Sequence, residues 1–247
     1  MRRASGAPVR SPPVTPDTRL RWGLGAFWIA WFASLVSGVV GGALAIAVLG
    51  SDVATDDPGI LIASLVAQAA GAVVAVAVVS ATRGQHGLRA DFGLEVRWRD
   101  APWLLVGIAL QIAVAIVLIP LTLLEPDQAQ QVVESFEETR GSGALVLFAF
   151  TVVVLAPLSE ELLFRGVLLR ALLRRTSPGS AVLWSSAIFA AVHVLLDPSV
   201  GSGLALPALM LLGLVSGDQA VRTRSLSRSM MLHAGFNFLT ALRILTL

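Results

Sequence analysis

The 247-residue sequence has no cysteine, no lysine and no tyrosine, and only 14% of its residues are charged. Without cysteine the chain forms no disulfide and offers no thiolate nucleophile, iron–sulfur cluster or cysteine-ligated zinc. Ordinary soluble domains carry about 25% charged residues, so the scarcity of charge excludes that class. With 55% apolar residues and a mean hydropathy of +0.79, the chain is neither disordered nor a basic nucleic-acid-binding domain. The sequence therefore predicts a membrane protein.

All 18 basic residues are arginine, which explains a pI near 10.8 at a net charge of only +2. The pI therefore gives no reason to expect a nucleic-acid partner. A chain without lysine and rich in Ala, Arg, Gly and Val is typical of a bacterial genome of high GC content. We expect a multi-pass protein of the bacterial inner (plasma) membrane, with membrane lipids around it.

Apolar runs dominate the chain. A transmembrane helix needs roughly 17 to 25 residues to cross about 30 Å of hydrocarbon. Seven runs approach or exceed that length, the last three being short: 22–49, 59–81, 101–124, 144–173, 181–196, 204–215 and 230–247. They predict an all-α, polytopic transmembrane helix bundle of about seven spans, within a range of six to eight.

Arginine gathers on alternate connections between these runs. Sixteen of the 18 arginines lie in the tail 1–21, in the connections 82–100 and 216–229, or near the turn at 174–180. The opposite connections are acidic. Because basic residues mark the cytoplasmic loops of membrane proteins, we predict a cytoplasmic amino terminus.

The chain divides into three predicted regions. Residues 1–21 form a disordered cytoplasmic tail rich in Arg and Pro. Residues 22–143 hold three membrane spans with their connecting loops, and residues 144–247 hold the remaining spans. The outer connection 125–143 is long enough for a short surface helix around Val132.

Small residues recur every four positions in the first span, at Ser34, Gly38 and Gly42. This spacing lets two membrane helices approach closely. We therefore predict that this face of the first span packs against another helix.

Two adjacent glutamates, Glu160 and Glu161, interrupt the fourth run. A carboxylate at the middle of a membrane helix costs about 2.5 to 3.5 kcal/mol on insertion scales, so such groups are usually functional. Glu161 and Arg165 are four residues apart and are predicted to pair on one helix face. Glu160 is turned by about 100° and is left for a different partner.

Pro157 stands just before the two acids and cannot donate a hydrogen bond to the carbonyl of Val153. Backbone groups freed at membrane depth are tolerated where protein or water reaches them. We therefore predict a kink and a water-accessible pocket beside the glutamates.

Two further helices each carry a histidine one turn from a second residue of interest: Phe189 with His193, and His233 with Asn237. At 1.5 Å per residue, Glu160 lies about 21 Å from the cytoplasmic boundary and His193 about 18 Å. His233 lies only about 5 Å inside the last run, so either that helix begins earlier or the site opens toward the cytoplasm. The sequence favours the cytoplasm-facing cavity.

Three motifs in residues 144–247 resemble those of a known family. Glu160 to Arg165 looks like a Glu-Glu-x-x-x-Arg motif, Phe189 to His193 like Phe-x-x-x-His, and His233 to Asn237 like His-x-x-x-Asn. In this order they resemble the CPBP intramembrane metalloprotease family, also called the CAAX protease or Abi family, which includes type II CAAX prenyl endopeptidases. By this resemblance, residues 144–247 are a CPBP-like catalytic membrane core.

The resemblance implies an intramembrane endopeptidase that hydrolyses a peptide bond of a membrane-associated protein or peptide. Its catalytic residues would be Glu160, Glu161, His193, His233 and Asn237. Glu160 and His193 would activate water, while His233 and Asn237 would stabilise the oxyanion. Arg165 and Phe189 would support the motif helices.

The cofactor stays open. Glu160, His193 and His233 are acceptable zinc ligands, and zinc would lower the pKa of a bound water to about 7. Against a metal, the sequence has no His-Glu-x-x-His pair, and the family has both metal-dependent and metal-independent interpretations. We prefer a metal-free glutamate mechanism.

Two other functions compete with proteolysis. A proton-coupled transporter could use Glu160, Glu161 and His193 as a proton relay, but the repeated halves common in transporters are not evident in the sequence. A catalytically inactive family member could serve as an immunity or scaffold protein.

Overall fold

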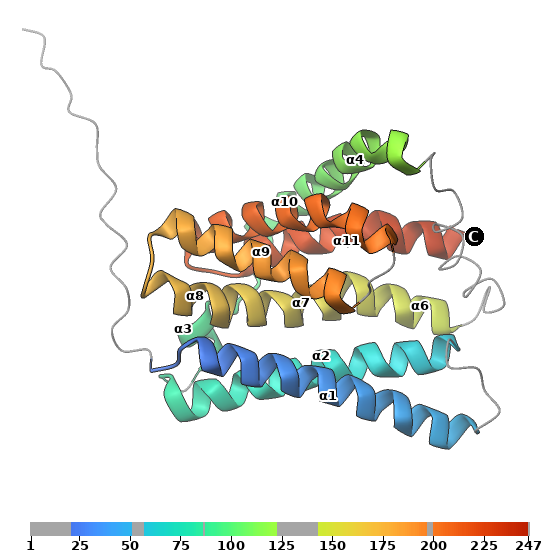
Figure 1. The fold of residues 1–247 in the computed structure, drawn as a ribbon, viewed down its shortest axis with the longest axis horizontal. Helices are drawn as coiled ribbons and strands as arrows, with labels where there is room; N and C mark the ends of the chain where they lie inside the picture. Colours follow the sequence, from blue (N-terminus) through green and yellow to red (C-terminus); the bar gives the residue numbers. More distant parts are fainter. Residues whose placement is uncertain (1–20, 51–56, 86, 123–142, 197–199, 247) are drawn as a thin grey trace, which may run out of the picture.

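The computed structural model of the chain describes residues 21–50, 57–85, 87–122, 143–196 and 200–246. Within these ranges the chain forms helices and no strand, which confirms the predicted all-α, polytopic bundle (Figure 1). Residues 1–20 of the predicted tail and the surface helix predicted around Val132 lie outside the described residues.

The helices follow the apolar runs closely. The amino-terminal elements are α1 (Leu24–Leu49), α2 (Pro58–Arg83), the short α3 (Leu88–Phe92), the 3₁₀ turn η1 (Trp98–Asp100) and α4 (Pro102–Thr122). One continuous helix then runs from Gly143 to Leu173 as α6 (Gly143–Phe150), η2 (Thr151–Leu155), α7 (Ala156–Glu161), η3 (Leu162–Leu168) and α8 (Leu169–Leu173). The last three helices are α9 (Pro178–Leu196), α10 (Val200–Thr223) and α11 (Ser227–Thr246).

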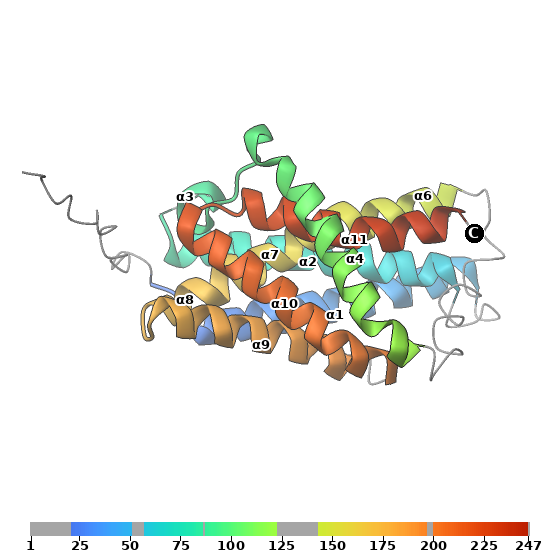
Figure 2. The ribbon, with the colours of Figure 1, turned by 90° about the horizontal axis from the view of Figure 1, so that it is seen from above.

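In the described ranges, five helical segments are long and apolar enough to cross a membrane: α1, α2, η1 with α4, the helix Gly143–Leu173, and α9. The helices α10 and α11, of 24 and 20 residues, lie beside them (Figure 2). The chain is thus a multi-pass membrane protein, and a total of seven spans stays a prediction.

The last helices extend beyond their apolar runs. The run 204–215 lies inside α10, which extends from Val200 to Thr223 and carries the ion pair of Asp218 with Arg222, 2.7 Å at a four-residue spacing, in its last turns. The last run was predicted to begin at Met230, but α11 begins three residues earlier, at Ser227.

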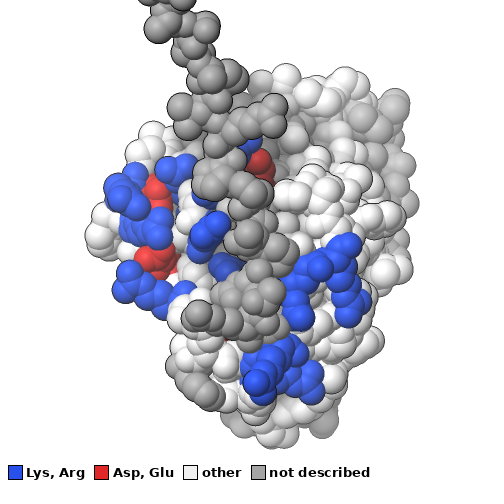
Figure 3. All heavy atoms as spheres, turned by 90° about the vertical axis from the view of Figure 1, so that its left-hand side faces the viewer, with Lys and Arg blue, Asp and Glu red and all other residues white. Residues whose placement is uncertain are grey.

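The arginine-rich connections meet at one end of the bundle, which faces the viewer in Figure 3. There the backbone N–H of Arg21 donates to the Arg83 carbonyl at 3.2 Å. The Arg174 guanidinium likewise donates to the carbonyl of Trp22 at 2.6 Å, which ties the end of α8 to the start of α1. The arginine-rich connections therefore gather at one end, as the alternation predicts, while most of the acidic connections lie outside the described residues. Which side of the membrane this end faces stays a prediction.

The small-residue face of the first span packs as predicted. Ser34, Gly38 and Gly42 are buried in α1, and a Cβ on Gly38 would lie 3.2 Å from the Cβ of Gln68 in α2. The closest approach is at Gly41, where a Cβ would lie 2.4 Å from the Cβ of Ala67 and 2.8 Å from the carbonyl oxygen of Ala63. The close contact of α1 with α2 therefore requires glycine, which has no side chain, at these positions.

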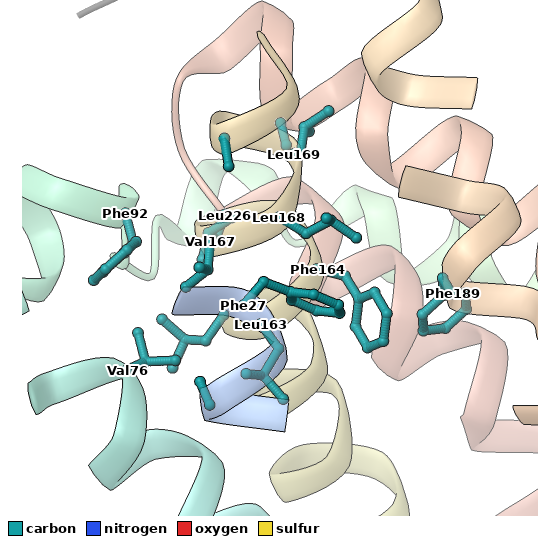
Figure 4. Packing of buried hydrophobic residues seen from close by; sticks show 14 of the residues in the cluster. Phe27, Val76, Phe92, Leu163, Phe164, Val167, Leu168, Leu169, Phe189 and Leu226 are labelled. Atoms are coloured by element: carbon teal, nitrogen blue, oxygen red, sulfur yellow. The ribbon is translucent and has the colours of Figure 1, made fainter. Parts of the chain in front are cut away.

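The motif helix lies at the centre of the bundle. Every residue of η3, from Leu162 to Leu168, is buried. Figure 4 shows Phe27 of α1, Phe164 of η3 and Phe189 of α9 side by side. Their ring centroids are 5.3 Å apart for Phe27 and Phe164 and 5.0 Å apart for Phe164 and Phe189, both in edge-to-face arrangements. This aromatic row links the amino-terminal helices to the motif-bearing helices.

The start of α11 is buried beneath the connection Leu88–Asp100. The N–H of Leu226 donates to the Gly93 carbonyl at 2.9 Å, and the N–H of Arg97 donates to the Ser227 hydroxyl at 2.9 Å. Gly93 has φ of 71°, and a Cβ there would lie 2.4 Å from the carbonyl oxygen of Arg224, so the contact requires glycine. The arginine-rich connection 82–100 thus also covers the amino end of α11.

We expect Gly41→Ala to lower the free energy of unfolding by about 1 to 3 kcal/mol, because the added methyl group overlaps the backbone of α2. The measurement is thermal unfolding of the purified chain in detergent. Gly25→Ala is the matched control in the same helix, since a Cβ there meets nothing within 4 Å. Equal stability of the two variants would contradict the close contact of α1 with α2.

Candidate active site

Three helices bring the two glutamates and two of the histidines together. Glu160 lies in α7, His193 in α9 and His233 in α11. The Glu160 Oε2 atom is 3.6 Å from Nε2 of His193 and 3.6 Å from Nε2 of His233. The partner that the sequence left open for Glu160 is therefore a pair of imidazoles.

Glu161 has the partner that its spacing predicts and one more. Its Oε1 atom is 3.1 Å from Nη1 of Arg165 and 3.1 Å from Nδ1 of His233. All three side chains are buried, with at most 4% of any of them exposed. A buried carboxylate needs such compensation, because desolvation of an unpaired charge is very costly.

The exposed fractions of the side chains divide the site into an open and a closed half. The Glu160 side chain is 25% exposed and that of His193 is 33% exposed, whereas those of Glu161 and Arg165 are 0% and 1% exposed. The exposed part of Glu160 and His193 thus lies in front of the closed ion pair, while the Oε2 atom of Glu160 is itself buried. The water-accessible pocket predicted beside Pro157 stays a prediction.

Phe189 is the apolar centre of the site. Its ring is fully buried and lies 4.5 Å from the His193 ring and 5.8 Å from the His233 ring, centroid to centroid. The guanidinium carbon of Arg165 lies over the same ring, 4.5 Å from its centroid. A desolvated cation over an aromatic face contributes about 2 kcal/mol. Phe189 thus holds Arg165 and both histidines in fixed relative positions.

The outer ring nitrogens of the two histidines both face acceptors. The Nδ1 atom of His193 is 2.7 Å from the Phe189 carbonyl oxygen, and that of His233 faces the Glu161 carboxylate. Because a carbonyl oxygen only accepts hydrogen bonds, Nδ1 of His193 carries a proton, and the same reasoning applies to His233 beside an ionised carboxylate. The Nε2 atoms, which face Glu160, are therefore available to exchange protons or to contact a substrate.

Asn237 is on the same helix as His233 but contacts a different group. Its amide nitrogen donates to the Val152 carbonyl at 2.9 Å. In the described part of the chain no hydrogen bond joins Asn237 to the glutamates or histidines of the site. The sequence grouped Asn237 with these residues. In the structure Asn237 contacts the long helix Gly143–Leu173 at Val152, about two turns before Glu160.

Two π-helical segments, η2 and η3, lie on either side of α7, the segment that contains Pro157. The kink predicted at Pro157 stays a prediction. Such wide turns inside helices occur frequently at functional sites. Ser185 of α9 contributes to their stability, since its buried hydroxyl donates to the Phe164 carbonyl at 3.2 Å. Sequence reasoning missed Ser185, and its only signal was a hydroxyl one turn before Phe189 on the helix that carries His193.

The depth discrepancy of His233 is reduced by the start of α11. His233 is six residues from Ser227, about 9 Å along the helix, whereas Glu160 is thirteen residues from Leu173, about 20 Å. The two meet because the amino end of α11 is itself buried: Ser225, Leu226 and Ser227 are at most 1% exposed. The earlier start of α11 thus contributes to the contact, and the cytoplasm-facing cavity that the sequence favours stays a prediction.

A metal is the cofactor that these side chains suit by their chemistry. Histidines that bind zinc donate their outer N–H to a carboxylate or a backbone carbonyl, as His233 and His193 do here. However, the described residues contain no group of three or more His, Asp or Glu side chains close enough together to hold a metal ion. The donor types fit zinc, but the arrangement is not a preassembled metal site.

The comparison with protein families agrees with the motifs. Residues 142–239 match the family described as type II CAAX prenyl endopeptidase Rce1-like. The matched range contains all seven motif residues, from Glu160 to Asn237, and confirms the resemblance to the CAAX protease family. No curated protein and no solved structure matches the chain.

We expect Arg165→Met to lower the free energy of unfolding by about 3 to 5 kcal/mol, because Glu161 would remain as a buried charge with reduced compensation. The measurement is chemical or thermal unfolding in detergent. The matched control is Arg222→Met, which breaks an ion pair of the same four-residue spacing whose side chains are 70% and 45% exposed. We expect little change there. A small effect of Arg165→Met would show that the Glu161 charge is not held in a closed environment.

Proposed function

We propose that this chain, whose residues 142–239 match the type II CAAX prenyl endopeptidase Rce1-like family, is an intramembrane endopeptidase. It would hydrolyse a peptide bond of a membrane-associated protein or peptide. The observation that carries the proposal is the position of Glu160, whose Oε2 atom faces the Nε2 atoms of two histidines at 3.6 Å each.

Glu160, Glu161 and Arg165 together carry one excess negative charge, and one proton on a histidine makes the group neutral. In the proposed mechanism His233 holds this proton, because its two ring nitrogens face the two carboxylates, Nδ1 toward Glu161 and Nε2 toward Glu160. His193 then stays neutral, with its proton on Nδ1 and a lone pair on Nε2.

These protonation states give each group a role. A water molecule between Glu160 and His193 would donate one proton toward Oε2 of Glu160 and the other toward Nε2 of His193. Glu160 would take a proton as the water oxygen attacks the peptide carbonyl carbon. The N–H on Nε2 of His233 would donate to the oxyanion, an interaction worth about 2.7 to 4 kcal/mol in the transition state. Glu160 would then return the proton to the leaving amine as the C–N bond breaks.

The closed half of the site would keep this geometry fixed. Glu161 accepts from His233 and is itself held by Arg165, which in turn lies over Phe189. Preorganised groups need no rearrangement during the reaction, which is why they lower the barrier. We therefore assign Glu160, His193 and His233 as catalytic residues, with Glu161, Arg165 and Phe189 holding them.

The surroundings of the reaction follow from the fold and composition. The substrate would be reached within the membrane, so it is a membrane-associated peptide or protein. We propose that the chain works in the plasma membrane of a bacterium, on the basis of its arginine-only composition. In such a host prenylated CAAX proteins are not expected, and the tail of another membrane protein or a bacteriocin-like leader is the better candidate.

We expect Glu160→Gln to abolish cleavage, a loss of about 10² to 10⁴ in rate, because the amide cannot take a proton from water. The measurement is mass spectrometry of membrane peptides from cells that make the wild-type or the variant chain at equal levels. Asp218→Asn is the control, since that acid is exposed and pairs only within α10. Cleavage retained in the Glu160 variant would contradict the proposal.

The same variants separate the competing functions. Proton flux in proteoliposomes that disappears with Glu160→Gln, without any cleavage, would indicate a transporter. A cellular phenotype that survives when Glu160 and His193 are both replaced by Ala would indicate a scaffold.

We expect a metal chelator to leave cleavage unchanged, because the side chains that face Glu160 are not arranged as a metal site in the described ranges. The measurement is the cleavage rate before and after dialysis against the chelator, followed by addition of zinc. Loss of cleavage that zinc restores would assign Glu160, His193 and His233 as metal ligands instead.

A further inference from the structure

The backbone around Pro157 lacks one hydrogen-bond donor. In a π-helical turn, the N–H of residue i+5 donates to the carbonyl of residue i, as the N–H of Ala156 does to the carbonyl of Thr151. The next bond in this register would join residue 157 to the Val152 carbonyl. Proline has no N–H, so Pro157 cannot form it.

Asn237 of α11 supplies a donor to this same carbonyl. Its Nδ2 atom lies 2.9 Å from the carbonyl oxygen of Val152. The alternative α-helical donor, the N–H of Ala156, is already bonded to Thr151. A carbonyl without a donor is costly inside a membrane, where water does not replace the missing bond. The Asn237 amide thus stands where the N–H of residue 157 would be.

We infer that Asn237 is a positioning residue that replaces the missing N–H of Pro157 and so fixes Glu160 against His233. The contact pins α11 to the long helix at a second point. Asn237 holds the turn that precedes Pro157, and His233, one helical turn earlier in α11, contacts the glutamates that follow Pro157. The two contacts together set the rotation and the offset of α11.

This role differs from direct stabilisation of the oxyanion, which the motif resemblance implies for Asn237. One amide hydrogen is committed to Val152, and the effect on catalysis passes through the positions of Glu160 and His233. The catalytic part of the inference rests on the proposed function, whereas the structural part does not.

Three variants of the full-length chain test the inference: Asn237→Ala, Pro157→Ala and the double variant. Asn237→Ala leaves the Val152 carbonyl without a donor, so we expect lower thermal stability and about a tenfold or greater loss of cleavage rate. Pro157→Ala restores a backbone N–H, so we expect cleavage within about twofold of wild type. The double variant should behave like Pro157→Ala, because the backbone then satisfies Val152.

A spectroscopic readout separates positioning from general stability. The chain has only three histidines, His86, His193 and His233, so ¹⁵N-labelled imidazole signals can be assigned by single replacements in detergent. Asn237→Ala should shift the His233 signals, and the double variant should return them to the wild-type positions. Because this readout does not require cleavage, it tests the inference even if the chain proves not to be a protease.

Pro120→Ala is the matched control, since Pro120 is another proline inside a helix and lies in α4. It should not rescue Asn237→Ala. A second variant, Asn237→Leu, has nearly the same size and no hydrogen-bond donor, and it should show the same loss and the same rescue.

The inference is overturned if Asn237→Ala matches the wild type in stability and in its His233 signals. It is also overturned if the double variant stays as impaired as Asn237→Ala, whether in folding, in histidine signals or in cleavage. If the double variant regains stability and histidine signals but not cleavage, Asn237 would instead act by direct contact with the substrate.

Discussion

The buried ion pair between Glu161 and Arg165 is the interaction on which the rest of the site depends. Two adjacent carboxylates in a membrane helix repel each other and lose their hydration, so at least one must be neutralised within the protein. Arg165 does this at 3.1 Å while its guanidinium lies over Phe189. With Glu161 compensated, its second contact orients His233, and Glu160 is free to face both histidines in the open half of the site.

The helices outside the family match also hold this arrangement. Residues 142–239 carry all the motif positions, yet Phe27 of α1 packs on Phe164 and Phe92 of α3 packs close to Gly166 of the motif helix. The helix α4 contacts α11 backbone to backbone, since a Cβ on Gly107 would lie 2.0 Å from the Leu232 carbonyl oxygen. The amino-terminal half is therefore a support for the helix that carries His233, and its tolerance to substitution should follow these contacts.

Much of the fold is determined by local sequence. Hydropathy finds each of the seven long helices in the described ranges, and most of their ends to within a few residues, because each apolar run must satisfy its own backbone inside the membrane and only a helix does so. The pairing of Glu161 with Arg165 follows from helical periodicity in the same way. The differences arise where a helix continues past its apolar run: α10 goes on through the exposed pair Asp218 and Arg222, and the covered segment at Ser227 starts α11 early.

The sequence by itself determined which side chains share a helix face: Glu161 with Arg165, Phe189 with His193, and His233 with Asn237. It also determined that a carboxylate at membrane depth needs partners. Only the tertiary structure decided that Glu160 faces two Nε2 atoms, that His233 joins both glutamates, and that Asn237 serves Val152. The physical reason is that spacing along one helix is fixed by its backbone hydrogen bonds. The offset and rotation between helices depend on packing among residues far apart in the chain.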